Sequence, residues 1–155
     1  MTDLQAIILI WLTIFNQGQR AEKTLRDVIE FSKQFGNDYQ RFMKMDYYQI
    51  EKAIYFPRKL HRFPKKMAMY IFESVCTINE RFGGKASKVF RDAGKVQENL
   101  LLFKGIGEHK ARVGTYFSEC FFNMDNVISQ IDTIPCNLDI EIVYDELLYL
   151  KFLGK

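Results

Sequence analysis

The sequence predicts an all-α fold, and three observations support this prediction. Apolar residues recur every three or four positions along most of the chain, which is the period of a helix with one buried face. Proline stands at one expected helix start, and glycines stand at several expected helix ends. No segment has the alternation of a β-hairpin, and no βαβ pattern occurs. With 155 residues, 48% of them hydrophobic, we expect one domain over residues 1–155 with a sizeable core.

The first two predicted helices have different characters. Residues 4–15 are mostly apolar, which is typical of a helix at the centre of a fold. Residues 20–35 are amphipathic, and Gly36-Asn37 is their expected stop. The apolar side of this second helix consists of Ala21, Leu25, Val28, Ile29 and Phe35.

Two shorter helices and a long one follow. The short ones are predicted over residues 38–45 and 47–55, and a loop is expected around Phe56-Pro57. Pro64 suits the first turn of the long helix, which we expect to end at Gly83-Gly84. Its apolar stripe comprises Met67, Tyr70, Ile71, Val75 and Ile78.

The second half of the chain is also predicted to be helical. Short helices are expected over residues 85–90 and 97–103, and a longer one over residues 110–121. Residues 123–137 are less regular. Residues 138–153 are expected to form the closing helix.

Composition excludes several classes of protein. The net charge is only +3, so any nucleic-acid surface must be local. The three cysteines are far apart and lack metal-site spacing, so we expect reduced thiols, no disulfide framework and a cytoplasmic protein. The apolar run 6–15 is too short to span a membrane and lacks the features of a signal peptide, so no membrane partner is expected.

The segment Leu102 to Ala111 is the most informative for function. Gly105 and Gly107 flank Ile106, and this spacing predicts a tight hairpin between two helices over residues 97–121. We expect Phe103 and Ile106 to pack under the turn. The amides of residues 107–109 then lie at a helix N-terminus, where an anion such as a phosphate is favoured.

Four segments, in this order, resemble the helix-hairpin-helix-GPD superfamily of DNA glycosylases, the endonuclease III-like base-excision enzymes. They are Ile14-Phe15-Asn16-Gln17-Gly18-Gln19, Lys66-Met67-Ala68 through Arg81-Phe82-Gly83-Gly84, Leu102 through Ala111, and Leu138-Asp139-Ile140-Glu141-Ile142-Val143. The resemblance implies a DNA-glycosylase-like helical bundle whose partner is duplex DNA with a damaged or mispaired base. The chain departs from the family in lacking its C-terminal cysteine cluster, so we expect no iron–sulfur cluster and a truncated second helical domain.

The resemblance implies a catalytic aspartate after the hairpin, and two residues compete for this role. Asp139 begins the expected closing helix and is the first choice, although aspartate is also an ordinary N-cap. Asp132 lies closer to the family's spacing from Gly107, but Pro135 follows it where a helix should begin. Either carboxylate would stabilise the positive transition state or orient the attacking water.

The position of the family's Schiff-base lysine is taken by His109. A neutral imidazole cannot replace an amine in this reaction, so we expect base removal without strand cleavage. Lys110 is the neighbouring residue, about 100° round the helix, and should not point the same way. The resemblance further implies a monovalent cation on the hairpin carbonyls of Lys104, Ile106 and Gly107, and no other cofactor.

Further residues are candidates for DNA contact, each with a plainer structural alternative. Gln17 matches a residue that fills the gap left by a flipped nucleotide in some family members, and is otherwise a helix-end residue. The pair Tyr47-Tyr48 is a candidate wall of the base pocket, whereas most aromatic residues belong to the core. Phosphates are expected to contact a basic rim, unless these charges are merely solvated. The rim and hairpin candidates are Arg58, Lys59, His61, Arg62, Lys65, Lys66, Lys104, Glu108, His109, Lys110 and Arg112.

The sequence therefore predicts a minimal, monofunctional DNA glycosylase that flips a damaged base and hydrolyses its N-glycosidic bond. The alternative is a non-catalytic DNA-binding protein derived from such an enzyme. A third reading, in which the hairpin only packs helices in a protein adaptor, leaves the basic stretch without a role.

Overall fold

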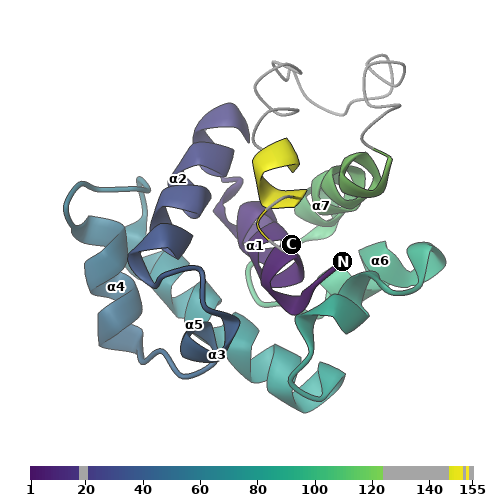
Figure 1. Cartoon of the computed structure of the whole chain (residues 1–155), viewed down its shortest axis with the longest axis horizontal. Helices are drawn as coiled ribbons and strands as arrows, with labels where there is room; N and C mark the ends of the chain where they lie inside the picture. The colour runs from purple at the N-terminus through teal and green to yellow at the C-terminus, as the bar shows by residue number, and fades with distance from the viewer. Residues whose placement is uncertain (18–20, 124–146, 152, 154–155) are drawn as a thin grey trace.

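The structure is a computed structural model that describes residues 1–17, 21–123, 147–151 and 153. Every regular element in these ranges is a helix, so the all-α prediction is confirmed (Figure 1). The helices surround one buried helix near the N-terminus. No helix in the described ranges is long and apolar enough to cross a membrane.

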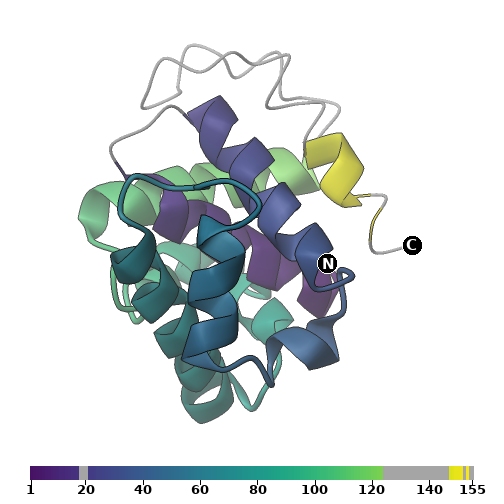
Figure 2. The ribbon, with the colours of Figure 1, turned by 90° about the vertical axis from the view of Figure 1, so that its left-hand side faces the viewer.

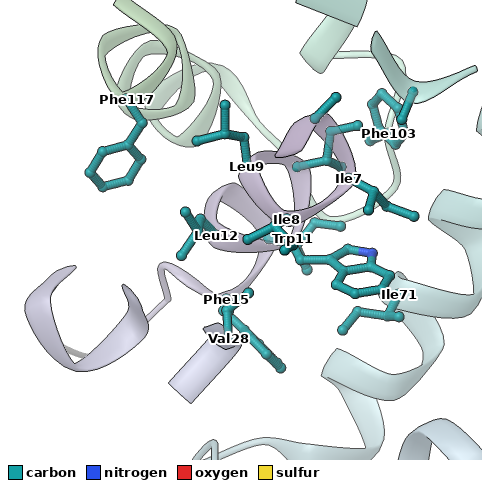
Figure 3. Packing of buried hydrophobic residues seen from close by; sticks show 14 of the residues in the cluster. Ile7, Ile8, Leu9, Trp11, Leu12, Phe15, Val28, Ile71, Phe103 and Phe117 are labelled. Atoms are coloured by element: carbon teal, nitrogen blue, oxygen red, sulfur yellow. The ribbon is translucent and has the colours of Figure 1, made fainter. Parts of the chain in front are cut away.

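The central helix is α1 (Asp3–Phe15), in which every residue from Gln5 onward is buried. A capping box between Thr2 and Gln5 starts it. Helices α2, α3, α5 and α7 and the 3-10 helix η1 all contact it. Figure 3 shows its side chains pointing outward into these neighbours on several sides, with Trp11 beside Ile71 and Leu9 toward Phe117. The helix is apolar on all sides because all its sides are covered.

Three helices follow on one side of α1. Helix α2 (Ala21–Gln34) ends where Gly36 and Asn37 adopt positive φ, as predicted. Helix α3 (Tyr39–Phe42) and helix α4 (Tyr47–Tyr55) are short, and aspartate side chains cap both of their N-termini. Figure 2 shows α2 and α4 on the same side of the molecule, and the two helices are in contact.

The long helix α5 (Pro64–Phe82) has the predicted start and end. Pro64 occupies its first turn, and Gly83 ends it with φ of 61°. Met67, Ile71 and Ile78 of the predicted stripe are fully buried, while Tyr70 is half-buried at the side where the hairpin packs. Helix α5 contacts both α1 and α4.

The chain then forms η1 (Ala86–Phe90), η2 (Ala93–Lys95), α6 (Val96–Leu100) and α7 (Glu108–Phe122). Helix α7 begins two residues earlier than predicted. Gly114 allows α7 to pack closely, because a Cβ there would lie 2.4 Å from Oγ1 of Thr13 in α1 and 2.9 Å from Cδ1 of Leu100 in α6. Ala111 of α7 is also fully buried. No local sequence pattern marks Gly114 as a contact.

Residues 147–151 are helical, in agreement with the predicted closing helix over this part. They lie beside the start of α1, where Nε2 of Gln5 donates to the carbonyl oxygens of Leu150 and Lys151 at 3.3 and 3.0 Å. The remainder of that predicted helix and the segment 123–137 lie outside the described residues, apart from Asn123 and Leu153.

Candidate nucleic-acid interface

The hairpin predicted from the glycines is formed by α6, a loop over residues 101–107, and α7. The two helices are in contact, and Phe103 and Ile106 are buried beneath the loop, as predicted. Gly107 is the N-cap of the 15-residue helix α7 and makes no side-chain cap. A Cβ at Gly107 would meet nothing within 4 Å, so the N-terminus of α7 is open to solvent. This end of the helix carries the positive pole of its dipole.

Gly105 is required by both its conformation and its neighbour. Its φ is 90°, and a Cβ there would lie 2.6 Å from Cδ2 of Tyr70. The backbone of the loop therefore rests directly on the Tyr70 ring. This contact fixes the hairpin against α5, and the sequence analysis had assigned Tyr70 only to the apolar stripe.

Lys110 points inward and joins the hairpin to α1. Its Nζ donates to the carbonyl oxygens of Ile14 and Gly105, at 2.8 and 2.9 Å, and to Oε1 of Gln17 at 3.0 Å. The ammonium also lies 5.9 Å from the centre of the Tyr70 ring. Burial, together with the positive charge of Lys66, lowers the pKa of Lys110 to about 8.

The position of Lys110 differs from its expected place on the basic rim. Its three acceptors use all three donors of an ammonium group, so it has no donor left for a phosphate. Oε1 of Gln17 is likewise engaged by this contact, and its NH₂ group remains as a donor.

The other basic candidates of the hairpin and of α5 are exposed. His109 and Arg112 share the solvent face of α7 because they are three residues apart. Lys104 is exposed in the loop, and Lys66 is exposed on α5 close enough to lower the pKa of Lys110. Lys59, Arg62 and Lys65 are exposed around the start of α5, and Glu108 is the exposed acid among these residues.

Arg58 and His61, two residues of the predicted basic stretch, make other contacts in the structure. Arg58 forms ion pairs with Asp27, at 3.0 Å, and with Glu30, at 2.5 Å, so two carboxylates balance its charge. His61 is 1% exposed and stacks on Phe15. The expectation that His61 contributes to a basic rim is therefore wrong.

The tautomer of His61 follows from its hydrogen bonds. Its Nδ1 accepts from the amide of Phe63 at 3.0 Å, so Nε2 carries the proton and donates to the carbonyl oxygen of Phe15 at 3.0 Å. Burial lowers the pKa of this imidazole. His61 is thus a neutral group that fixes the end of α1 to the start of α5.

The tyrosine pair lies on the surface at the start of α5. The hydroxyl of Tyr47 is 3.5 Å from the carbonyl oxygen of Lys65, and Tyr48 packs edge-on against Tyr47 with 81% of its surface exposed. Tyr47 therefore lies beside the backbone of Lys65, one of the exposed lysines. Neither ring lines the cleft between α2, α3 and α4 that is described next.

One cleft was not anticipated from the sequence. It has a volume of about 510 Å³ and lies between α2, α3 and α4. Its lining includes Arg41, Lys52 and Phe56, none of which is a predicted site residue. In Figure 1, α4 and α6 are on opposite sides of the molecule, so this cleft is distant from α6.

The two candidate catalytic aspartates, Asp132 and Asp139, lie outside the described residues. Within the described ranges, no group of three or more His, Cys, Asp or Glu side chains could hold a metal ion.

The hairpin loop is a poor fit to the monovalent cation implied by the resemblance. The carbonyl oxygen of Gly107 accepts the amide of Ala111 at 2.9 Å, and the Lys110 ammonium is bound to the carbonyl of Gly105. Like charges a few ångströms apart repel each other, even near a protein surface. A metal ion on the neighbouring carbonyls of Lys104 and Ile106 would share the loop with this ammonium.

Comparisons of this chain with protein-family models, curated proteins and solved structures found no match.

Proposed function

We propose that this protein binds duplex DNA through the face formed by the hairpin and the start of α5. The open N-terminus of α7 carries this proposal, since its amides and its dipole favour a phosphate. Lys66, Lys104 and Arg112 are exposed around it and supply the positive charge that a phosphate backbone requires. Contacts of this kind hold the backbone and read no base.

We further propose that this binding serves a DNA glycosylase of the helix-hairpin-helix type. The order of the four matching segments supports this activity. A damaged nucleotide would be extruded from the stack, and Asp139 or Asp132 would assist hydrolysis of its N-glycosidic bond. No strand cleavage is expected, because His109 is not an amine and the Lys110 amine is fully engaged.

A second candidate is a DNA-binding protein without catalysis. The described residues include the proposed phosphate-binding groups but neither candidate aspartate. Phosphate binding alone requires no catalytic carboxylate. Binding and base removal must therefore be measured separately.

Replacing Gly107 tests the DNA-binding proposal. In Gly107→Asp, the new carboxylate caps α7 and occupies its amides, so we expect the free energy of unfolding to rise by roughly a few tenths of a kcal/mol, because glycine is already an acceptable N-cap. Its charge repels phosphate, so duplex affinity should fall at least tenfold in fluorescence anisotropy. Gly107→Ala is the matched control, since its side chain enters open space and carries no charge. Equal DNA affinity of Gly107→Asp and the unmodified protein would rule out the hairpin as the phosphate site.

The glycosylase proposal needs a separate assay. After incubation with duplexes that each contain one damaged base, heating in alkali breaks the strand wherever a base has been removed. Full activity in Asp139→Asn but not in Asp132→Asn would identify Asp132 as the catalytic residue. Salt-sensitive binding with no base removal from any duplex would favour the non-catalytic candidate.

A further inference from the structure

The last turn of α1 lacks a basic residue of its own. The final carbonyl groups of a helix have no partner within the helix and lie at the negative pole of its dipole. Two of these carbonyls are satisfied by distant residues. His61 binds the carbonyl of Phe15, and Lys110, which is 96 positions along the chain, binds the carbonyl of Ile14.

The same ammonium group reaches two further segments. The carbonyl of Gly105 belongs to the hairpin loop, and Gln17 follows α1. The three oxygen atoms therefore come from the end of α1, the segment after it and the hairpin loop. Neutral oxygen atoms of this kind are also the usual ligands of hard metal cations.

The three distances, 2.8 to 3.0 Å, are those of ordinary hydrogen bonds, and each acceptor takes one donor of the ammonium. Neither a planar guanidinium nor an apolar side chain of similar length satisfies three convergent acceptors in this way. Tyr70 closes one side of the arrangement, since its ring lies under Gly105 and near Nζ. The geometry therefore calls for a compact cation at this point.

We propose that the ammonium group of Lys110 is the structural cation of the hairpin, joining its loop to the end of α1 in place of a bound metal ion. This inference goes beyond the proposed function, because it concerns the hairpin whether or not the protein binds DNA. It also replaces the expectation of a monovalent cation on the carbonyls of Lys104, Ile106 and Gly107.

The test is the dependence of thermal stability on the cation in the buffer. Unfolding of the unmodified protein is followed at neutral pH in potassium, sodium and choline chloride at equal ionic strength, without DNA. We expect one Tm in all three salts. A higher Tm in potassium than in choline would overturn the proposal, and this measurement needs no variant.

The variant Lys110→Met leaves the three acceptors without a donor. We expect its Tm to fall by roughly 3–6 °C in choline chloride and to recover in part in potassium chloride. Lys104→Met is the control, because Lys104 lies in the same loop but is exposed, so its Tm should be that of the unmodified protein. An equal Tm of Lys110→Met in potassium and choline would also overturn the proposal.

Gln17→Ala provides a milder variant should Lys110→Met fail to fold. It removes one of the three acceptors and leaves both carbonyl groups in place. We expect a smaller loss of Tm, identical in the three salts, because the ammonium remains. A Tm of Gln17→Ala that depended on potassium would contradict the assignment.

Discussion

The partly buried amine of Lys110 makes the stability of this protein depend on pH. Its pKa is about 8 in the folded protein and 10.5 for an ordinary lysine. Between these values the unfolded chain holds a proton that the folded protein has released, so stability rises with pH. Lys110 gives no pH dependence of stability below about pH 8, where it is protonated in both states. It gives none above about pH 10.5, where it is deprotonated in both.

We therefore expect the stability difference between the unmodified protein and Lys110→Met to shift by roughly 1–3 kcal/mol in favour of the unmodified protein over this interval. Urea unfolding at a series of pH values measures both proteins, whose other titratable groups are the same. Lys66→Gln removes a repelling charge, so it should raise the pKa of Lys110 and narrow the pH range over which stability changes. A difference that stays constant with pH would show that Lys110 has an ordinary pKa.

For single residues, the sequence identified the chemical groups of the candidate site, but not the direction in which their side chains point. Local rules identified Gly105 and Gly107, because the turn itself demands them. Lys110 was interpreted as a surface cation, since its partners Ile14 and Gln17 are more than 90 positions away and no local pattern reveals them. His61 was misplaced for the same reason.

At the level of helices, the contact of α7 with α1 depends on one missing side chain. In Gly114→Ala, the added methyl group meets Thr13, whose buried hydroxyl donates to the carbonyl oxygen of Leu9. We expect a loss of about 1–3 kcal/mol in the free energy of unfolding, although alanine alone favours a helix. Thr13→Ala removes both of the Thr13 atoms that the methyl group meets, so the double variant should recover part of the loss, as a urea-based double-mutant cycle will show.

Gly94→Ala is the control for this prediction. Gly94 lies in η2, where the nearest atom to an added Cβ is 3.5 Å away. A change within about 0.5 kcal/mol is expected there. Should Gly114→Ala be as mild as Gly94→Ala, α7 does not depend on this close approach.

Helix boundaries were predictable wherever a backbone signal marks them. Pro64 and Gly83 delimit α5, and Gly36 ends α2, because each residue restricts or permits particular backbone angles. The sequence did not reveal η2, a single short turn in which Asp92 accepts the amide of Gly94. Such a turn is too short to show a period.

At the scale of the whole molecule, a small net charge of +3 is compatible with a local basic face because some cations are neutralised elsewhere. Arg58 faces the carboxylates of Asp27 and Glu30, and Lys23 also pairs with Asp27. The exposed cations of the hairpin face have no such partner among the described residues. Counting charges along the sequence could not distinguish the paired cations from the exposed ones. The pairing results from the packing of α2 against the loop before α5.

This separation predicts how the affinity for duplex DNA depends on salt. Each phosphate contact contributes about 0.9 to the negative slope of log K against log salt concentration. Lys66→Gln, Lys104→Gln and Arg112→Gln should each reduce that slope by about 1, as anisotropy titrations at several salt concentrations can measure. Arg58→Gln should leave the slope unchanged while lowering stability, because it exposes no phosphate-binding group and deprives Asp27, whose side chain is 2% exposed, of one cation. A slope that falls with Arg58→Gln but not with Lys104→Gln would place the DNA at the loop before α5 that carries Arg58, and away from the hairpin.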